Sequence, residues 1–268
     1  MKAKKRVGKK SNKKIIKARK KIILKKLKKK KLGIKASTGI SRFDKMTKGG
    51  FERDSINLII GGSGSGKTIF ALQFLLEGVK RGENVLYVTF EEKKDEFYEN
   101  MKKFGWDLEK VEKTGKFIFL EHSPEKVKMM LDEGGGVIES IVIKNQIKRM
   151  VIDSITSFSL LFEDELSKRQ SNLSLFDIIR KWNLTTLLTV QDNPSEKTGK
   201  NISQIEFEAD SITLLYFVNI KNKRKRFIEV LKMRGTDHSR EIHSFDIKIG
   251  IKIDGIANIK KEDLIEKG

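Results

Sequence analysis

Short apolar runs alternate with longer amphipathic segments along this chain of 268 residues. Short runs bounded by polar or glycine residues are typical of buried strands, whereas apolar residues three and four positions apart are typical of helices. The predicted strands are residues 56–60, 84–90, 117–120, 150–153, 186–190, 212–218 and 226–232, with strand-like sequence again within 242–253. The predicted helices are residues 68–80, 93–113, 124–131, 138–148 and 166–182.

This order of elements decides the fold class. Strands that alternate with helices favour a parallel sheet, and consecutive strands near the end of the chain favour antiparallel pairing. The sequence therefore predicts an α/β fold with a mostly parallel, twisted sheet, flanked by helices and carrying an antiparallel edge. Among the connections, Ser41 is expected to be a helix N-cap and Gly49 with Gly50 to form a turn. Residues 191–204 are predicted to be a mobile loop, and residues 221–225 a basic turn.

A glycine-rich loop stands between the strand at 56–60 and the helix at 68–80. The run from Gly61 to Thr68 reads GGSGSGKT and matches the phosphate-binding pattern G-x-x-x-x-G-K-[ST]. Backbone N–H groups can converge on phosphate oxygens where no Cβ blocks the approach, and the start of a helix adds further donors. The predicted nucleotide contacts are Gly62, Ser63, Gly64, Ser65, Gly66, Lys67, Thr68 and Ile69. Lys67 is expected to neutralise the β- and γ-phosphates and Thr68 to ligate Mg²⁺. The alternative is a glycine-rich turn with a chance lysine.

Carboxylates follow two of the predicted strands. Asp153 ends the strand at 150–153, and open α/β sheets bind ligands at the carboxyl ends of their strands. It is assigned to the Mg²⁺ shell, directly or through water, and a plain acidic strand cap is the alternative. Glu91 and Glu92 end the strand at 84–90, where neighbouring side chains are expected to point to opposite faces. One is predicted to activate the attacking water while the other supports it, with Glu91 favoured as the base. A solvated acidic pair is the alternative.

The order of these motifs resembles that of KaiC-like domains, in the RecA-like branch of P-loop ATPases. The motifs are Thr38-Gly39-Ile40, the glycine-rich loop, Val88-Thr89-Phe90-Glu91-Glu92, Val151-Ile152-Asp153-Ser154 and Lys232-Met233-Arg234-Gly235-Thr236-Asp237-His238. The resemblance covers residues 35–255 and implies a RecA-like P-loop NTPase core that often assembles as a hexameric ring with ATP between subunits. The clock protein KaiC has two such domains in tandem, so only the single-domain ATPase part carries over. Autokinase activity stays open.

The resemblance also implies a contribution from a neighbouring subunit. In the family, the segment from Lys232 to His238 approaches ATP held by the adjacent subunit. Lys232 and Arg234 would then stabilise charge on the transferring phosphoryl group, while Met233, Thr236 and His238 would contact the same nucleotide. The alternative is a surface hairpin with solvated charges.

Basic residues are concentrated at the start of the chain. The net charge is +21, but residues 1–31 contain 18 Lys or Arg and no acid, which leaves 39 basic and 36 acidic residues in the remainder. Charge repulsion predicts that residues 1–34 form a lysine-rich tail that is disordered when free or helical on an anionic surface. The tail could tether nucleic acid, act as a solvated or localising segment, or bind an acidic membrane or protein. The predicted ATPase domain is 35–255, followed by a C-terminal extension at 256–268.

Composition excludes several kinds of site and of protein. The chain has no cysteine, which excludes disulfides and thiolate metal sites and suits a reducing cytoplasm. No apolar run approaches the ~18 residues of a membrane-spanning helix. Three histidines show no spacing typical of a metal site.

These features predict a cytoplasmic, regulatory protein that slowly hydrolyses ATP to ADP and phosphate with Mg²⁺. The predicted sites lie at subunit interfaces of a ring or filament, with a hexamer favoured. Its predicted catalytic residues are Lys67, Glu91, Glu92, Lys232 and Arg234. One alternative is a non-hydrolysing, ATP-gated assembly switch. The other is a DNA-binding recombinase or repair accessory ATPase, which would bind DNA through the basic tail and the loop at 191–204.

Overall fold

The computed structural model describes residues 35–123, 126, 136–192, 194 and 202–264. The predicted tail at 1–34, most of the predicted helix at 124–131 and residues 195–201 of the predicted loop lie outside the described residues. The chain divides into two units, Met1–Lys35 and Ala36–Gly268. The elements below all belong to the second unit. None of the described helices combines the length and the apolar character needed to cross a membrane.

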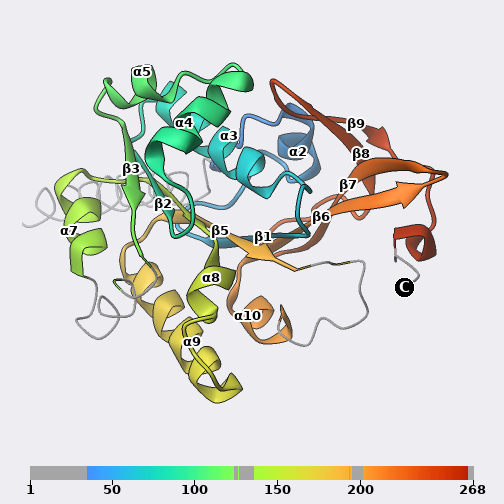
Figure 1. Cartoon of the computed structure of the whole chain (residues 1–268). Coiled ribbons are helices and arrows are strands. Elements are labelled where there is room, and N and C mark those ends of the chain that lie inside the picture. Colours follow the sequence, from blue (N-terminus) through green and yellow to red (C-terminus); the bar gives the residue numbers. More distant parts are fainter. Residues whose placement is uncertain (1–34, 124–125, 127–135, 193, 195–201, 265–268) are drawn as a thin grey trace, which may run out of the picture. The chain divides into compact units, whose positions relative to one another are not determined.

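The described residues form a nine-stranded sheet with the order β3-β2-β4-β5-β1-β6-β7-β8-β9 (Figure 1). Pairing is parallel from β3 through β6 and antiparallel from β6 to β9. The strands are β1 Ile56–Gly61, β2 Val85–Thr89, β3 Phe117–Glu121, β4 Arg149–Asp153, β5 Thr185–Gln191, β6 Ser211–Ile220, β7 Lys223–Met233, β8 His243–Lys248 and β9 Gly250–Ile256. The predicted α/β class, with a mostly parallel sheet and an antiparallel edge, is confirmed.

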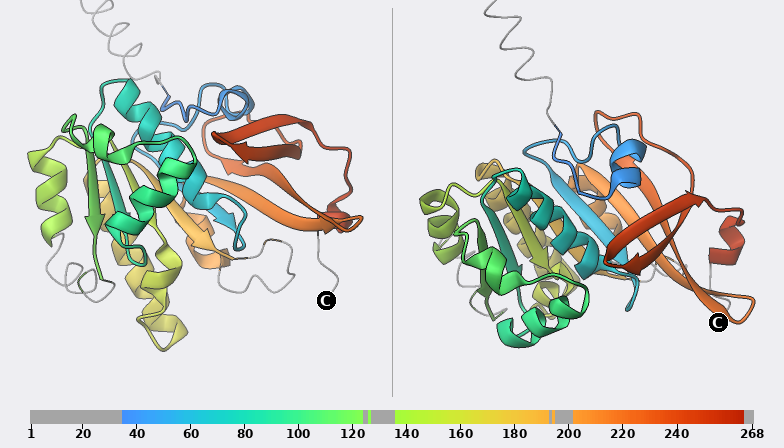
Figure 2. Two further views of the ribbon diagram at one scale, coloured as in Figure 1. Left: turned by 45° about the horizontal axis from the view of Figure 1, so that its top comes forward. Right: turned by 90° about the horizontal axis from the view of Figure 1, so that it is seen from above.

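Helices cover both faces of this sheet (Figures 1 and 2). They are α2 Ser41–Met46, α3 Lys67–Lys80, α4 Lys94–Lys103, α5 Leu108–Glu112, α7 Gly136–Lys144, α8 Ile155–Ser159, α9 Glu165–Lys181, α10 Ile202–Glu208 and the 3-10 helix Lys261–Leu264. The helices α2 to α5 enclose one apolar core and α7 to α10 enclose the other. On β1, Ile59 joins the first core while Leu58 and Ile60 join the second. Its continuous apolar sequence therefore reflects burial on both faces.

The structure corrects several predicted boundaries. The predicted helix at 93–113 is two helices, because the chain turns at Gly105 with φ +81 and Asp107 then caps α5 by accepting from the Lys110 N–H at 3.0 Å. The predicted helix at 138–148 ends at Lys144. Ser41 is not an N-cap, since it is already the first residue of α2 and Ile40 holds the cap position.

Two short helices were not predicted, and one turn is tighter than predicted. Helix α8 follows β4 directly, and α10 begins inside the segment 191–204 that was predicted to be a loop. The basic turn is shorter than the predicted 221–225: only Lys221 and Asn222 separate β6 from β7, with φ 50 and 62. Two successive residues with positive φ are typical of a tight hairpin turn that matches the twist of the strands.

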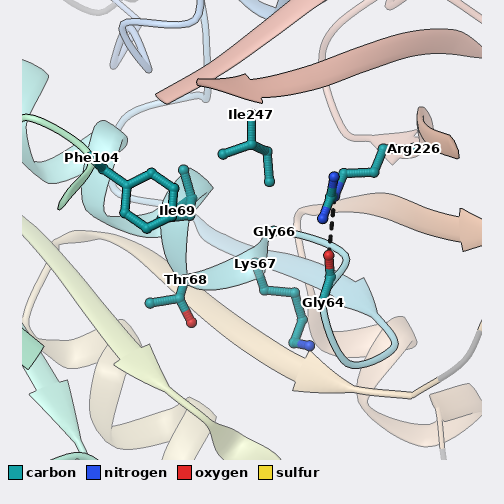
Figure 3. Close-up of a pocket in the computed structure, with 8 residues that line it drawn as sticks. All are labelled: Gly64, Gly66, Lys67, Thr68, Ile69, Phe104, Arg226 and Ile247. Atoms are coloured by element: carbon teal, nitrogen blue, oxygen red, sulfur yellow. Dashed lines mark hydrogen bonds between the residues drawn. The ribbon is translucent and has the colours of Figure 1, made fainter. Parts of the chain in front are cut away.

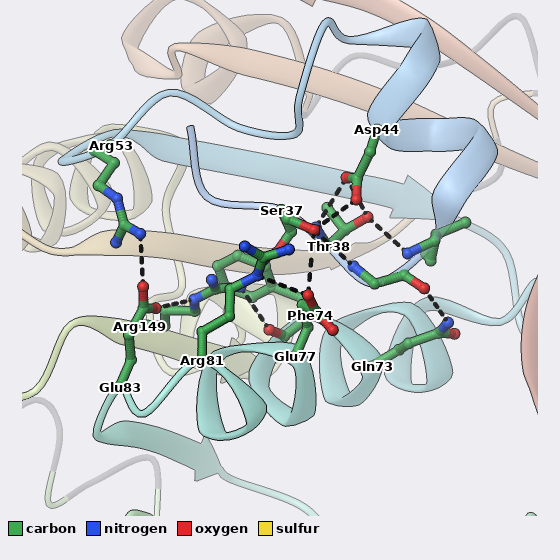
Figure 4. A network of polar contacts seen from close by, with 12 residues as sticks. Ser37, Thr38, Asp44, Arg53, Gln73, Phe74, Glu77, Arg81, Glu83 and Arg149 are labelled. Carbon is green, nitrogen blue, oxygen red and sulfur yellow. Dashed lines mark hydrogen bonds and ion pairs between the residues drawn. The ribbon is translucent and has the colours of Figure 1, made fainter. Parts of the chain in front are cut away.

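A polar network joins the start of β4 to α3 and to the N-terminal segment of the domain (Figure 4). Arg149 is fully buried; its Nε donates to Glu83 at 2.5 Å, and another nitrogen donates to the carbonyl oxygens of Ser37 at 2.6 Å and Phe74 at 2.9 Å. Arg53 donates to the other Glu83 oxygen at 2.6 Å. Burial opposes ionisation of Glu83, yet these two arginines hold its pKa below the ordinary value.

The predicted motif Thr38-Gly39-Ile40 belongs to the same region. The Asp44 carboxylate accepts from the Thr38 backbone N–H at 2.9 Å and from the Thr38 hydroxyl at 2.8 Å. Gln73 on α3 donates to the Gly39 carbonyl at 3.1 Å. These contacts attach the motif to α2 and α3, so it has a structural role in this domain (Figure 4).

Candidate nucleotide and magnesium site

The glycine-rich loop leaves the carboxyl end of β1 and turns sharply into α3. Gly64 and Gly66 have φ values of 72 and 102, a region that favours glycine. At Gly61 a Cβ would lie 2.4 Å from the Ser65 Oγ and 2.7 Å from the Leu215 carbonyl oxygen. A side chain at this position would therefore force the loop away from the sheet. The Ser65 side chain is buried against Gly61, beneath the loop.

The start of α3 presents backbone donors. The Phe70 N–H donates to the Gly66 carbonyl at 2.9 Å, whereas the N–H groups of Lys67, Thr68 and Ile69 find no acceptor among the described residues. Free N–H groups at a helix N-terminus, together with the positive end of the helix dipole, are suited to phosphate oxygens. The geometry of this loop therefore fits the predicted phosphate cradle.

Two cavities meet at this loop and share Gly64, Lys67 and Thr68 in their walls. The first, of about 220 Å³, is polar and is lined by Ser63, Gly64, Lys67, Thr68, Thr89, Glu91, Glu92, Asp153, Ser154 and Gln191. The second, of about 390 Å³, adds apolar and aromatic side chains and is lined by Gly64, Gly66, Lys67, Thr68, Ile69, Phe104, Arg226 and Ile247 (Figure 3). One loop thus separates an acidic chamber from a more apolar one.

Asp153 lies in the acidic chamber beside the loop. It ends β4, and the parallel pairing of β2 with β4 places Thr89 next to it. The Thr68 hydroxyl donates to Asp153 Oδ2 at 2.8 Å, and the Thr189 hydroxyl donates to Oδ1 at 2.5 Å. Mg²⁺ takes oxygen ligands and is commonly held by one or two protein groups with substrate phosphates and water. The pair Thr68 and Asp153 fits this pattern, and the described residues contain no larger metal-binding cluster of His, Cys, Asp or Glu.

The two glutamates follow β2 and line the same chamber. The expectation that they point to opposite faces of a strand is wrong, because β2 ends at Thr89 and both side chains lie in the loop beyond it. The Thr89 hydroxyl accepts from both backbone N–H groups, at 3.3 and 3.2 Å. Glu91 accepts from the hydroxyl of Ser157 on α8. This contact orients the Glu91 carboxylate.

Charge in the chamber is unbalanced. Three carboxylates, those of Glu91, Glu92 and Asp153, line the chamber with a single ammonium group, that of Lys67, which donates to the Gly62 carbonyl at 3.0 Å. Burial lowers the pKa of Lys67, while Asp153 and Glu91 oppose that change. Loss of water contact raises the pKa of Glu92, and the charges of Asp153 and Glu91 raise it further. A bound divalent cation would relieve this repulsion.

The predicted segment from Lys232 to His238 lies at the other end of the sheet. Met233 pairs with Ser211, which pairs with Asn57 near the start of β1. Lys232 donates to the Glu206 carbonyl at 2.8 Å, and Arg234 donates to the Phe207 carbonyl at 2.6 Å, both at the end of α10. The Thr236 hydroxyl donates to Glu52 at 2.7 Å, and His238 bonds the Ser239 carbonyl at 2.8 Å. The structure does not bring these residues to the glycine-rich loop of their own chain.

The opposite end of β7 supplies a residue that sequence reasoning missed. The Arg226 Nε donates to the Gly64 carbonyl at 3.1 Å (Figure 3). The Arg226 guanidinium also lies 4.2 Å from the centre of the Phe217 ring. Phe104 and Ile247 complete the apolar chamber. These side chains come from distant segments and share no motif. Only the register of the β6–β7 hairpin could have indicated Arg226.

A family model described as "ATPase: KaiC" matches residues 36–258. The chain belongs to the KaiC family of ATPases. Membership of the KaiC family confirms the resemblance inferred from the motifs and supports an ATP-binding ATPase. In this member of the family, the glycine-rich loop and Asp153 lie together at the carboxyl ends of the parallel strands, as described above.

Individual relatives agree with this assignment. The circadian clock protein KaiC3 of Synechocystis is 36% identical over 237 residues, which covers 85% of this chain and 47% of that protein. A UPF0273 protein of Thermotoga maritima is 34% identical over 80% of this chain and 92% of its own length. A solved KaiC-like protein from Pyrococcus horikoshii has a TM-score of 0.73 and 33% identity, and covers 82% of this chain and 98% of its own. The chain thus spans about half the length of the clock proteins it matches.

Proposed function

We propose that this KaiC family member hydrolyses ATP to ADP and phosphate in the acidic chamber, with Mg²⁺ held by Thr68 and Asp153. The observation that carries the proposal is the 2.8 Å hydrogen bond between those two side chains, in one chamber with Lys67 and Glu91. Mg²⁺ when bound would neutralise charge that develops on the phosphate oxygens. The other roles fall to protein residues.

The glycine-rich loop and Lys67 would hold the triphosphate. Backbone N–H groups of Lys67, Thr68 and Ile69 would donate to phosphate oxygens, and the Lys67 ammonium would balance their charge. Glu91 would accept a proton from water as that water attacks the terminal phosphorus. The hydroxyl of Ser157 fixes the Glu91 carboxylate for this task, and Glu92 would support the same water.

The second chamber would take the nucleoside. Phe104, Ile69 and Ile247 offer apolar surface to a base, while Arg226 places a cation between that chamber and the glycine-rich loop. Small-molecule sites commonly combine apolar walls with a few placed polar groups. The second chamber and the acidic chamber lie on opposite sides of the loop residues that they share. This arrangement supports a nucleotide that spans both chambers.

Assembly into a ring or filament, with a hexamer favoured, would complete the site. Lys232 and Arg234 lie at the sheet end opposite their own glycine-rich loop, so they could reach a nucleotide only in a neighbouring copy. An arginine supplied in this way can contribute about 10³–10⁵ in rate. Within the chain both cations also stabilise the carbonyl end of α10, which is a structural role they would keep.

The test is phosphate release from ATP, measured in Mg²⁺ and in excess EDTA. We expect Mg²⁺-dependent release by the wild type, and Glu91→Gln should bind ATP yet lose about 10²–10⁴ in turnover. Glu121→Gln, a matched change at the end of neighbouring β3, should keep the wild-type rate. Undiminished release by Glu91→Gln would contradict the assigned base. ATP binding without release by the wild type would favour an ATP-gated assembly switch.

The role of the neighbouring copy has a separate test. Lys67→Ala and Arg234→Ala should each be inactive alone. Mixed together, they should regain activity, because an Arg234→Ala subunit with an intact loop would meet the intact Arg234 of a Lys67→Ala neighbour. No recovery in a mixture whose co-assembly is shown by mass measurement would argue for the structural role alone.

A DNA-binding accessory ATPase stays a prediction, because the basic tail at 1–34 and most of the segment 191–204 lie outside the described residues. Adding DNA to the phosphate-release assay at low salt tests it. Slow turnover, a regulatory role and a cytoplasmic location likewise stay predictions.

A further inference from the structure

Tyr87 is a buried tyrosine whose hydroxyl reaches the candidate metal ligand from inside the core. It lies in the middle of β2, and its side chain is 1% exposed. The hydroxyl donates to Asp153 Oδ2 at 2.7 Å, the oxygen that also accepts from Thr68. Tyr87 lines neither chamber at the glycine-rich loop, so it would touch neither nucleotide nor metal.

The ring of Tyr87 is fixed by its neighbours. Phe119 on adjacent β3 stacks on it at 5.4 Å with an interplanar angle of 5°, and Phe97 from α4 packs at 4.9 Å. The Tyr87 hydroxyl therefore donates to Asp153 from a rigid position.

Hydrogen bonds from three hydroxyl groups orient the Asp153 carboxylate. Its three hydroxyl partners are Thr68, Tyr87 and Thr189. Thr68 belongs to the glycine-rich loop and is itself a candidate metal ligand, whereas Tyr87 and Thr189 belong to buried strands. A carboxylate has about four acceptor positions, so these donors leave room for a further partner. Groups that orient a metal ligand commonly tune metal affinity.

We propose that Tyr87 is a positioning residue that holds the Asp153 carboxylate against Thr68 and thereby sets the affinity of the site for Mg²⁺ together with nucleotide. This inference rests on the proposed function. It goes beyond that function by assigning part of the metal affinity to a side chain in the apolar core. In the sequence, Tyr87 lies between apolar residues of a predicted strand, a pattern typical of an ordinary core residue.

The test compares binding of a fluorescent, non-hydrolysable ATP analogue in excess Mg²⁺ and in excess EDTA. Tyr87→Phe keeps the ring and removes only the hydroxyl. We expect its Kd in Mg²⁺ to rise about 10–100-fold, with the Kd in EDTA unchanged. Tyr216→Phe is the matched control: the buried Tyr216 hydroxyl donates to Glu229 at 3.0 Å, away from both chambers. This control should leave both Kd values unchanged.

Three other outcomes would each contradict the role proposed for Tyr87. A Tyr87→Phe variant with wild-type Kd in Mg²⁺ would overturn the inference and leave the proposed function standing. An equal rise of Kd in Mg²⁺ and EDTA would also overturn it, because that result indicates a general packing role. If the wild type itself shows no nucleotide binding, the proposed function fails and the inference fails with it.

Discussion

Strand β4 and helix α3 each carry polar groups at both ends, and the two ends differ in how those groups are satisfied. At one end, Arg149 bonds Glu83 and the carbonyls of Ser37 and Phe74, so the buried cation has an anion and two further acceptors within the chain. At the other end, three carboxylates line one chamber with Lys67, and amides at the start of α3 have no acceptor among the described residues.

This difference separates stability from binding on the same two elements. A buried charge whose partners lie within the chain supports the fold, and its loss leaves those partners uncompensated. Carboxylates that repel one another weaken the fold slightly and favour binding of a cation. The N–H donors beside them face a cavity and favour binding of an anionic ligand. We therefore expect substitutions at the Arg149 end to change the free energy of unfolding, and those at the Asp153 end to change nucleotide binding.

The largest effect should come from Arg149→Met. Removing the cation leaves one Glu83 oxygen and the carbonyl oxygens of Ser37 and Phe74 without this donor, so the free energy of unfolding should fall by about 3–5 kcal/mol. Denaturant unfolding measures it. Arg53→Met is the control: this arginine bonds the same glutamate but its side chain is 32% exposed, so the loss should be below about 1 kcal/mol. Equal losses in the two variants would remove the distinction drawn for Arg149.

A smaller effect is expected from Gly78→Ala. A Cβ at this position on α3 would lie 2.8 Å from the Arg149 Cδ and Nε, so the guanidinium would have to shift. Overpacking costs about 1–3 kcal/mol, and better helix propensity returns up to about 1 kcal/mol. A net loss should therefore appear in denaturant unfolding. Gly255→Ala, where a Cβ meets nothing within 4 Å, is the control and should lose no stability. A stabilised Gly78→Ala variant would show that the network tolerates displacement.

The smallest effect concerns Glu92 and pH. The folded protein raises the pKa of Glu92 above its ordinary value of 4.5, so ionisation costs stability as pH rises through the folded pKa. Glu92→Gln should therefore be more stable than the wild type at neutral pH, and the difference should vanish below pH 4.5. Partial exposure keeps it under about 1 kcal/mol. Thermal unfolding across pH, with Glu121→Gln as control, measures it. A stability difference between Glu92→Gln and the wild type that grows toward low pH would contradict a raised pKa for Glu92.

Sequence reasoning brought together the parts of the candidate site that lie at strand ends. The glycine-rich loop, Asp153 and the glutamate pair follow strands in motif order, and the carboxyl ends of parallel strands meet at one edge of a sheet. Their position could therefore be inferred before the strand order was known. The short helices α8 and α10 were missed because five to seven residues give too little periodicity to separate a helix from a loop.

The parts that could not be predicted depend on tertiary contacts. Arg149 opens an apolar strand and Tyr87 lies within one, and nothing local indicates that each bonds a carboxylate from another element. Arg226 reaches Gly64 only through the register of the β6–β7 hairpin. Buried polar groups must find partners, but the sequence does not say which ones.

The central claim is that the Asp153 end of these elements binds nucleotide with Mg²⁺ while the Arg149 end supports the fold. Thermal unfolding with a non-hydrolysable ATP analogue and Mg²⁺ tests it most directly, in the wild type, Lys67→Ala and Lys80→Ala, the last at the far end of the same helix. The wild type and Lys80→Ala should gain about 2.7 kcal/mol at a ligand concentration 100 times Kd, and Lys67→Ala should gain nothing. Equal gains in all three proteins, or none in the wild type, would contradict the claim.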